Sequence, residues 1–454
     1  MAFDNDSDVY EDHADLYYSG KRLILTPHKS PAPFGSSFYP DPPNLTSKQM
    51  TPTDEEKSFS RTQLVFSESN GPLDFDETKQ NDKSSQVHLE ILDMVDGGYG
   101  SQYTPGPQKV LCKVVKTALT SSDDNEYKGL VLGQLVFLKV YDPLFWPLKV
   151  DLSEFCFKVT VRAGFAQSNE VGAYSHLFKA GLTGFPHLAP QYHGCWTISA
   201  TSADPKYAGK VRHVVALALE YIEGRCLSDL FQPSGPFRDR FRSSWSNPQE
   251  PPTYISADED TRLSVMEKLM DGLMSEEFAD VNHDNFHPSN MIISLKNGQT
   301  TLEQPRIVQV SYRRSKVTTL GRDPYKAYLY FAKKPHPFIR FSMNRLAPFF
   351  GWIPPSWEGQ NLGRDTPLFL YRWLAITFGP FVDNPTYTYR GSPPADMIVD
   401  AKGTVSQYSM YLENKRLEEK RHLEESKPDE SNKPDENSEE KKPREETVLA
   451  EEVL

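Results

Sequence analysis

Val281-Asn-His-Asp-Asn-Phe-His-Pro-Ser-Asn290 (VNHDNFHPSN) leads directly into the apolar run Met291-Ile292-Ile293. The stretch brings two histidines, a carboxylate and several amides together just before a predicted strand. Polar side chains held on a short loop beside a sheet are a common setting for catalytic groups. What this loop can do depends on the residues that the rest of the chain supplies around it.

Charge is distributed unevenly along the 454 residues. Residues 1–80 have a net charge of −7 and residues 411–454 a net charge of −6, whereas the whole chain carries −12. The middle of the chain is therefore close to neutral. A nucleic-acid-binding domain would carry a basic field there, so the composition does not favour that class of protein.

Composition also argues against several other classes. The four cysteines, Cys112, Cys156, Cys195 and Cys226, form no metal-binding pattern and indicate a reduced, intracellular protein. The acidic start MAFDNDSDVYEDHAD is unlike a secretory signal, and no apolar run is long enough to span a bilayer. We expect a cytoplasmic protein, with the nucleus as an alternative location, and no membrane partner.

The first part of the chain changes character near residue 85. Residues 1–84 are rich in Ser, Pro, Asp and Asn and are predicted to be a disordered acidic tail. Beyond them, alternating or apolar patterns predict strands, and apolar residues at helical spacing predict helices. The predicted strands are 87–95, 109–115, 130–141, 191–198 and 213–222, and the predicted helices are 170–180 and 226–231.

The second part begins with a polar, Pro-rich insertion at 232–258. A long helix is predicted over 257–278, followed by the loop quoted above, a strand at 301–310 and aromatic-rich helices within 340–378. Residues 396–454 read as a charged tail with a solvated helix over 407–425.

Several short motifs stand within these elements. Phe137-Leu-Lys-Val140 is similar to the strand that carries the phosphate-binding lysine of kinases, and Leu219-Glu-Tyr-Ile222 is similar to their adenine-binding connection. His287-Pro288 has the form found in aminoglycoside and choline kinases. Together with the order of the elements and with KVYDP at 139–143, GWIPPSW at 351–357 and WLAITFG at 373–379, these motifs resemble a fungal protein-kinase-like family.

The resemblance implies an α+β class: a bilobal protein-kinase-like fold with an antiparallel sheet N-lobe carrying one helix and a mainly helical C-lobe. The domain would cover residues 85–395, with the N-lobe at 85–222 and the C-lobe at 223–395.

The resemblance also implies site residues. ATP would contact the glycine-rich turn through Gly97, Gly98 and Gly100, the pair Lys139 and Glu170, and the connection at Glu220 and Ile222. His283, Asp284 and Asn285 would form the catalytic loop, and Asn290 and Ser311 would stand at the metal-binding positions. Two alternatives remain at this point: the glycines form a plain hairpin turn, and Lys139–Glu170 is a purely structural pair.

Two aspartates that phosphotransfer needs are absent. Asn285 stands five residues before Asn290, where a catalytic aspartate is required, and an amide accepts no proton at neutral pH. Ser311 stands where an aspartate would hold Mg²⁺, and Arg313 beside it repels a dication. Mg²⁺ binding is therefore not favoured.

These absences predict a pseudokinase that acts by binding an unknown protein partner, with ATP as the candidate ligand. The alternative is an active, atypical phosphotransferase that uses Asp284 as its base. Two lesser hypotheses are a metal site at His283, Asp284 and His287, and recognition of an acidic partner by Arg238, Arg240 and Arg242.

Overall fold

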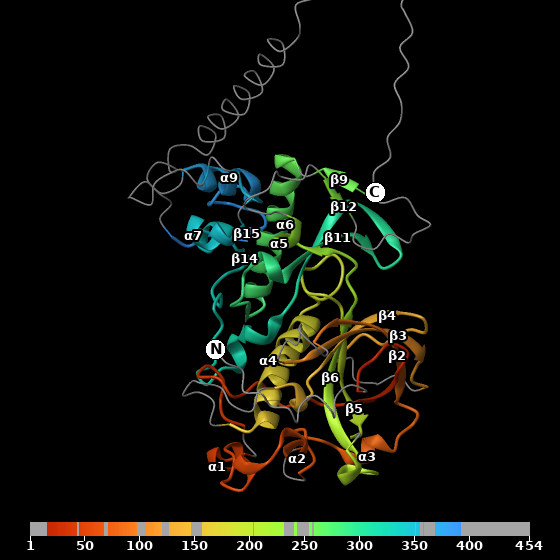
Figure 1. Ribbon diagram of the computed structural model, residues 1–454. Helices are drawn as coiled ribbons and strands as arrows, with labels where there is room; N and C mark the ends of the chain where they lie inside the picture. The colour runs from red at the N-terminus through yellow and green to blue at the C-terminus, as the bar shows by residue number, and fades with distance from the viewer. Residues whose placement is uncertain are drawn as a thin grey trace, which may run out of the picture. The chain divides into compact units, whose positions relative to one another are not determined.

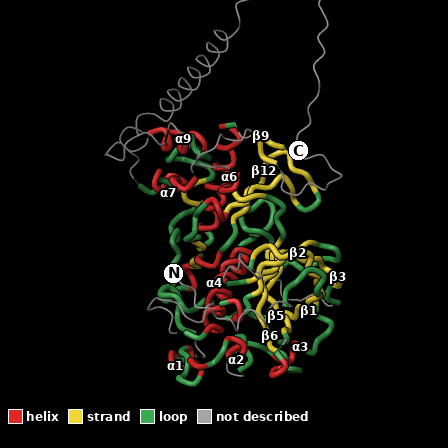
Figure 2. Tube along the Cα trace, viewed as in Figure 1, coloured by secondary structure: helices red, strands yellow, loops and turns green. Residues whose placement is uncertain are grey.

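The computed structural model describes residues 16–42, 45–67, 71–97, 106–119, 127–146, 157–202, 204–230, 240–242, 254–256, 258–349, 351–354, 357 and 368–391. The chain divides into two compact units, Met1–Gly391 and Ser392–Leu454, and all described residues lie in the first. Among the described helices, none combines the length and the apolar character needed to cross a membrane. Figure 2 shows how helices and strands are distributed along the trace.

A closed antiparallel barrel is the main sheet of the first unit (Figure 1). Its strands follow one another in the order β1-β2-β3-β4-β6-β5. They are β1 Arg22–Pro27, β2 Val87–Asp96, β3 Gln108–Lys116, β4 Leu135–Val140, β5 Tyr192–Ala200 and β6 Arg212–Glu220. Strand β1 pairs with both β2 and β5, and it thereby closes the sheet on itself.

Side chains alternate between the inside and the outside of the barrel because successive strand residues point to opposite faces. In β4, Val136, Leu138 and Val140 belong to the apolar cluster inside the barrel. The residues between them, Phe137 and Lys139, lie on the outer face. Lys139 is only 4% exposed there, so another element must cover it.

Helix α4, Val159–Lys179, supplies that cover. It packs against β5 and β6, and its Tyr174 and Leu177 share an apolar cluster with Leu217 and Leu219 of β6. Gly181 follows the helix with a φ of +72°, a conformation that ends helices readily. The helix predicted over 170–180 is therefore the second half of a longer one.

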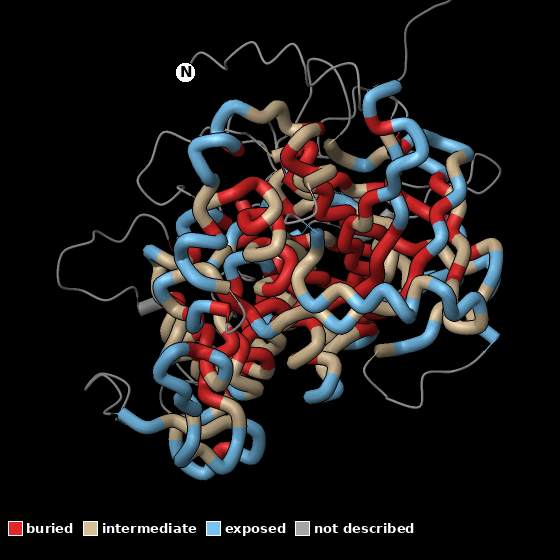
Figure 3. Tube along the Cα trace, turned by 90° about the horizontal axis from the view of Figure 1, so that it is seen from below, coloured by how far each residue is buried: buried red, intermediate tan, exposed pale blue. Residues whose placement is uncertain are grey.

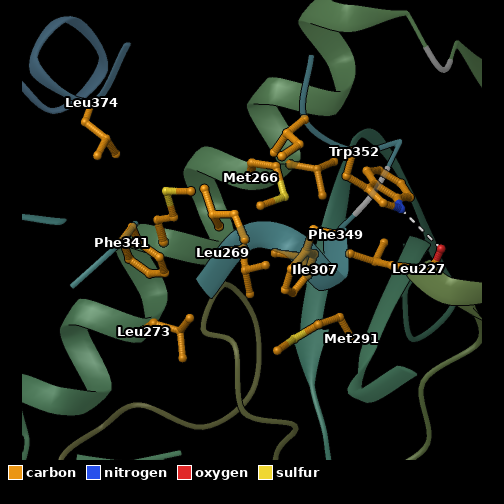
Figure 4. Packing of buried hydrophobic residues seen from close by; sticks show 14 of the residues in the cluster. Leu227, Met266, Leu269, Leu273, Met291, Ile307, Phe341, Phe349, Trp352 and Leu374 are labelled. Atoms are coloured by element: carbon orange, nitrogen blue, oxygen red, sulfur yellow. Dashed lines mark hydrogen bonds between the residues drawn. The ribbon is translucent and has the colours of Figure 1, made fainter. Parts of the chain in front are cut away.

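A second apolar core surrounds α6, Glu259–Phe278, so the helix predicted over 257–278 is present and begins two residues later than predicted. Asp258 caps the helix by accepting the backbone N–H of Thr261 at 2.7 Å. Figure 4 shows Leu269 and Phe349 in this core, together with the Trp352 indole, which donates to the Leu227 carbonyl at 3.2 Å. Figure 3 shows the buried residues running through the interior of the trace.

The remaining described α-helices are short, except α9. They are α1 Ser47–Met50, α2 Arg61–Val65, α3 Glu77–Gln80, α5 Leu227–Leu230, α7 Met343–Leu346 and α9 Leu368–Phe378. The remaining strands form small sheets: β7 Arg225–Cys226 with β11 Met291–Asn297 and β12 Thr300–Gln309; β8 Arg240–Arg242 with β9 Tyr254–Ser256; β10 Val281–Asn282 with β13 Lys316–Val317; and β14 Lys334–Pro335 with β15 Tyr387–Thr388.

The predicted bilobal protein-kinase-like fold is wrong. The strands expected to form an open N-lobe sheet form a closed six-stranded antiparallel barrel. The part expected to be a mainly helical C-lobe contains few described helices, and small sheets lie between them. The physical reason for the first difference is β1, which occupies the sheet edges that an open sheet would leave unpaired.

Strand β1 comes from the segment predicted to be disordered. For the described residues between 16 and 84 that prediction is wrong, because they form β1 and helices α1 to α3. Tyr39 of the same segment also bonds to residues at β13. Its hydroxyl donates to the Ser315 carbonyl at 3.1 Å and accepts the Val317 N–H at 2.8 Å. The segment is polar on average, so the few apolar residues that it buries did not indicate a folded region.

Other predicted features fall mostly outside the described residues. Within the insertion 232–258, the described strands β8 and β9 pair with each other. Arg238, the whole tail 396–454 and its predicted helix 407–425 lie outside the described residues.

The role of β1 can be tested with two neighbouring residues. Leu25 is fully buried, so Leu25→Ala should lower the free energy of unfolding by about 2–4 kcal/mol. Ile24 on the same strand is 47% exposed, and Ile24→Ala is the matched control, with a change below about 1 kcal/mol. Urea denaturation measures both. Equal, negligible effects would mean that residues 22–27 are not part of the folded barrel.

Candidate functional site

A buried ion pair joins the barrel to α4. The Lys139 Nζ atom lies 2.5 Å from Glu170 Oε1, and the two residues are 4% and 1% exposed. An ammonium group on a strand can be buried at tolerable cost only when it is paired in this way. The structure therefore brings together the two residues that were predicted to pair.

Glu170 accepts two further hydrogen bonds. Oε2 accepts the Tyr141 hydroxyl at 2.5 Å, and Oε1 also accepts the backbone N–H of Tyr312 at 3.1 Å. Burial alone would raise the pKa of Glu170, but the charge of Lys139 and the bonds from Lys139 and Tyr141 outweigh burial and lower it. The carboxylate stays ionised, and it connects a strand, a helix and a turn.

That turn begins at Ser311, the predicted metal position. Ser311 has a φ of 70°, a left-handed conformation that is costly for a residue with a side chain. The next residue, Tyr312, is fully buried, and its hydroxyl donates to Glu276 Oε1 at 2.6 Å. Its ring lies 4.7 Å from the ring of Tyr174 and 4.7 Å from that of His283. These contacts hold the strained turn in place.

His283 has a structural role in the loop. Its Nε2 lies 3.2 Å from the Val310 carbonyl, and its Nδ1 accepts the backbone N–H of Asn285 at 3.2 Å. Nε2 therefore carries the proton and donates. Burial lowers the pKa of His283 to about 4, so the ring is neutral at pH 7. A neutral ring engaged at both nitrogens cannot relay a proton.

The two loop asparagines also bond to each other. The Asn290 Nδ2 group donates to the Asn285 carbonyl at 3.0 Å, which ties the two ends of the predicted catalytic loop together. Asp284 directly precedes Asn285 and is exposed, and its carboxylate forms an ion pair with Lys316 of β13. Asp284 is therefore paired with Lys316, a different cation from the one that pairs with Glu170.

The described residues offer no obvious metal centre. Across the described ranges, no group of three or more His, Cys, Asp and Glu side chains is placed to hold a metal ion. His287, part of the hypothetical His283–Asp284–His287 site, has its Nδ1 atom 2.7 Å from the Ser289 hydroxyl. Ser311 and Asn290 supply only neutral oxygens, which are weak sole ligands for Mg²⁺.

Glu220, which was predicted to lie at an adenine site, forms its hydrogen bonds within the protein. Both carboxylate oxygens of Glu220 accept from Arg306, at 2.6 Å and 3.0 Å, and Oε2 also accepts the Gln191 N–H at 3.0 Å. Ile222 is half-buried just after β6. The Glu220 backbone N–H also donates, to the Gln191 carbonyl at 2.9 Å, so Glu220 is bonded within the protein through both its side chain and its backbone.

Of the predicted glycine-rich turn, only Gly97 lies within the described residues; Gly98 and Gly100 lie outside them. Gly97 has a φ of +100°, and a Cβ atom there would lie 2.3 Å from Gln108 Oε1. The end of β2 therefore requires glycine for reasons of backbone geometry, whether or not a phosphate approaches.

Sequence reasoning missed the residues that complete these contacts. Tyr141 stands two residues after Lys139, and strand alternation places both on the same face, so this partner could have been found. Tyr312, Arg306 and Lys316 carry no such signal, because their partners lie far away in the sequence.

The strength of the Lys139–Glu170 pair is measurable. Lys139→Met should lower the free energy of unfolding by about 3–5 kcal/mol, since Glu170 would remain buried and charged. Glu170→Gln in addition should recover part of that loss. Lys109→Met is the control: its ion pair with Asp96 is partly exposed, so the loss should stay below about 1 kcal/mol. Additive losses in the double variant would show that the two charges do not interact.

Glu276 predicts a pH dependence. Burial, with a smaller effect of Glu277, raises the pKa of Glu276 from 4.5 to about 8. Between pH 5 and 8 the folded protein keeps this proton and the unfolded chain releases it, so stability falls as the pH rises. Glu276→Gln is neutral throughout and should reduce that fall. Urea denaturation at pH 5, 6.5 and 8 measures it, and identical pH profiles for the two proteins would contradict the assignment.

No protein-family model matches this chain, and no curated protein matches it either.

Proposed function

We propose that this protein acts by binding and does not transfer phosphate: a pseudokinase-type function exerted on a protein partner, with ATP as the candidate ligand of the site around Lys139. The proposal concerns the chemistry of the site and does not require the bilobal fold. One observation carries it: the polar groups that would perform phosphotransfer are either replaced by neutral residues or bonded within the protein.

Glu170 is the main example. It accepts from Lys139, Tyr141 and Tyr312, so the ammonium of Lys139 is positioned by internal contacts before any ligand binds. Such a preorganised cation supports binding of an anion at little conformational cost. It does not supply the base or the metal that phosphotransfer needs.

The loop that contains His283, Asn285 and Asn290 also favours binding over phosphate transfer. Asn285 and Asn290 are bonded to each other, and His283 is neutral with both ring nitrogens engaged. Stabilisation of the charge that develops during phosphoryl transfer would require carboxylates and a metal at these positions. The residues present favour a rigid loop.

The alternative, an active atypical phosphotransferase, depends on Asp284. Its carboxylate is solvent-accessible, which suits a base, but it is paired with Lys316. A base has to be free to accept the proton of an attacking hydroxyl. The ion pair therefore disfavours this alternative.

ATP distinguishes the two functions. We expect ATP to raise the melting temperature without any need for Mg²⁺, and phosphate release to stay at the level of a protein-free blank, in the wild type and in Asp284→Ala alike. The measurements are thermal shift and a phosphate-release assay on the full chain. Phosphate release that needs Mg²⁺ and disappears in Asp284→Ala would overturn the proposed function in favour of the phosphotransferase.

A further inference from the structure

Arg313 differs from two buried arginines of the same unit, Arg306 and Arg212. Arg306 and Arg212 are buried, and each donates to a carboxylate through both terminal nitrogens. Arg313 follows Tyr312 in the turn and is exposed. Within the described part of the chain, it forms no ion pair or hydrogen bond. Its positive charge is therefore not neutralised by a direct contact there.

The guanidinium of Arg313 lies between the turn and the barrel. Its Nη1 atom is 4.0 Å from the place where a Cβ atom of Gly106 would stand. Gly106 has no side chain to screen the cation. Burial is the main cause of the lowered pKa of Lys139, and the charge of Lys139 is the main cause of the lowered pKa of Glu170; the charge of Arg313 adds a smaller lowering to each. The charge of Arg313 is therefore close enough to the buried pair to act on it electrostatically.

A second lysine adds to this environment. Lys109 of β3 lies directly opposite Lys139 of β4 in the strand register, so the two side chains point to the same face. Lys109 is paired with Asp96, and its side chain is 29% exposed. Among the described residues, three cations, Lys109, Lys139 and Arg313, therefore face two carboxylates, Asp96 and Glu170, and Arg313 is the cation without an ion-pair partner.

We propose that Arg313, assisted by Lys109, binds the phosphate groups of an anion that carries no divalent metal, such as the polyphosphate chain of a metal-free nucleotide. The inference rests on the proposed binding function and names the form of the ligand. A guanidinium presents two parallel N–H donors that fit two phosphate oxygens. Its fixed charge supplies the neutralisation that Mg²⁺ would otherwise provide.

The same cation sets a preference between ligand forms. A dication bound to the phosphates would lie near Arg313 and be repelled by it, and the neutral oxygens of Ser311 and Asn290 are weak ligands for it. The protein should therefore bind free polyphosphate more tightly than the Mg²⁺ complex. This order is the reverse of that expected for a metal-dependent phosphotransferase.

Inorganic tripolyphosphate is the direct probe, titrated calorimetrically into the full chain in EDTA and again with excess Mg²⁺. We expect binding in EDTA, at least about threefold weaker binding with Mg²⁺, and about tenfold weaker binding for Arg313→Gln in EDTA. Arg314→Gln removes the exposed neighbouring charge and is the matched control, with an expected change below about twofold. Arg313→Lys keeps the charge and should recover part of the affinity.

Several results would overturn the inference. They are an absence of tripolyphosphate binding by the wild type in EDTA, equal losses in Arg313→Gln and Arg314→Gln, tighter binding with Mg²⁺, or equal binding of sulfate at matched ionic strength. Melting temperatures of the variants without ligand verify that they fold. Phosphate release dependent on Asp284 would contradict the proposed function but not this binding result, so the two failures can be told apart.

Discussion

The ion pair between Lys139 and Glu170 is the contact on which the arrangement of the site depends. Burying two charges is unfavourable unless each is fully compensated. Glu170 meets that condition only because a strand residue, Tyr141, and the backbone of Tyr312 also donate to it. The position of α4 on the barrel and the course of the chain at Ser311 are consequently coupled, since moving either would leave a buried carboxylate short of donors.

Sequence reasoning located this pair correctly because an isolated lysine in an apolar strand requires a nearby carboxylate, and Glu170 stands in the next helix. It also located α6 from the spacing of its apolar residues. It failed for β1, where Leu23 and Leu25 are two buried residues in a short run flanked by polar and Pro-rich sequence. Their burial depends on partners more than sixty residues away, and the hydrophobic pattern of a short segment does not reveal such partners.

The loop from Val281 to Asn290 has a consistent physical character. Three of its polar residues form bonds inside the protein: His283 to Val310, Asn290 to Asn285, and Asp284 to Lys316. A polar group that is fully bonded internally rigidifies its surroundings and has little left to offer a substrate. Polar composition alone therefore could not distinguish a catalytic loop from a loop with a purely structural role.

The closure of the barrel by β1 has a consequence for how the chain behaves when it is shortened. A barrel has no free edge, whereas a sheet that lacks one strand exposes two rows of unpaired N–H and C=O groups, here on β2 and β5. Such edges pair readily with those of other molecules. A fragment that starts after residue 30 also loses Leu16, Tyr17, Leu23 and Leu25 from the barrel core. It should therefore self-associate during expression, even though it retains the core around α6, the ion pair and the loop.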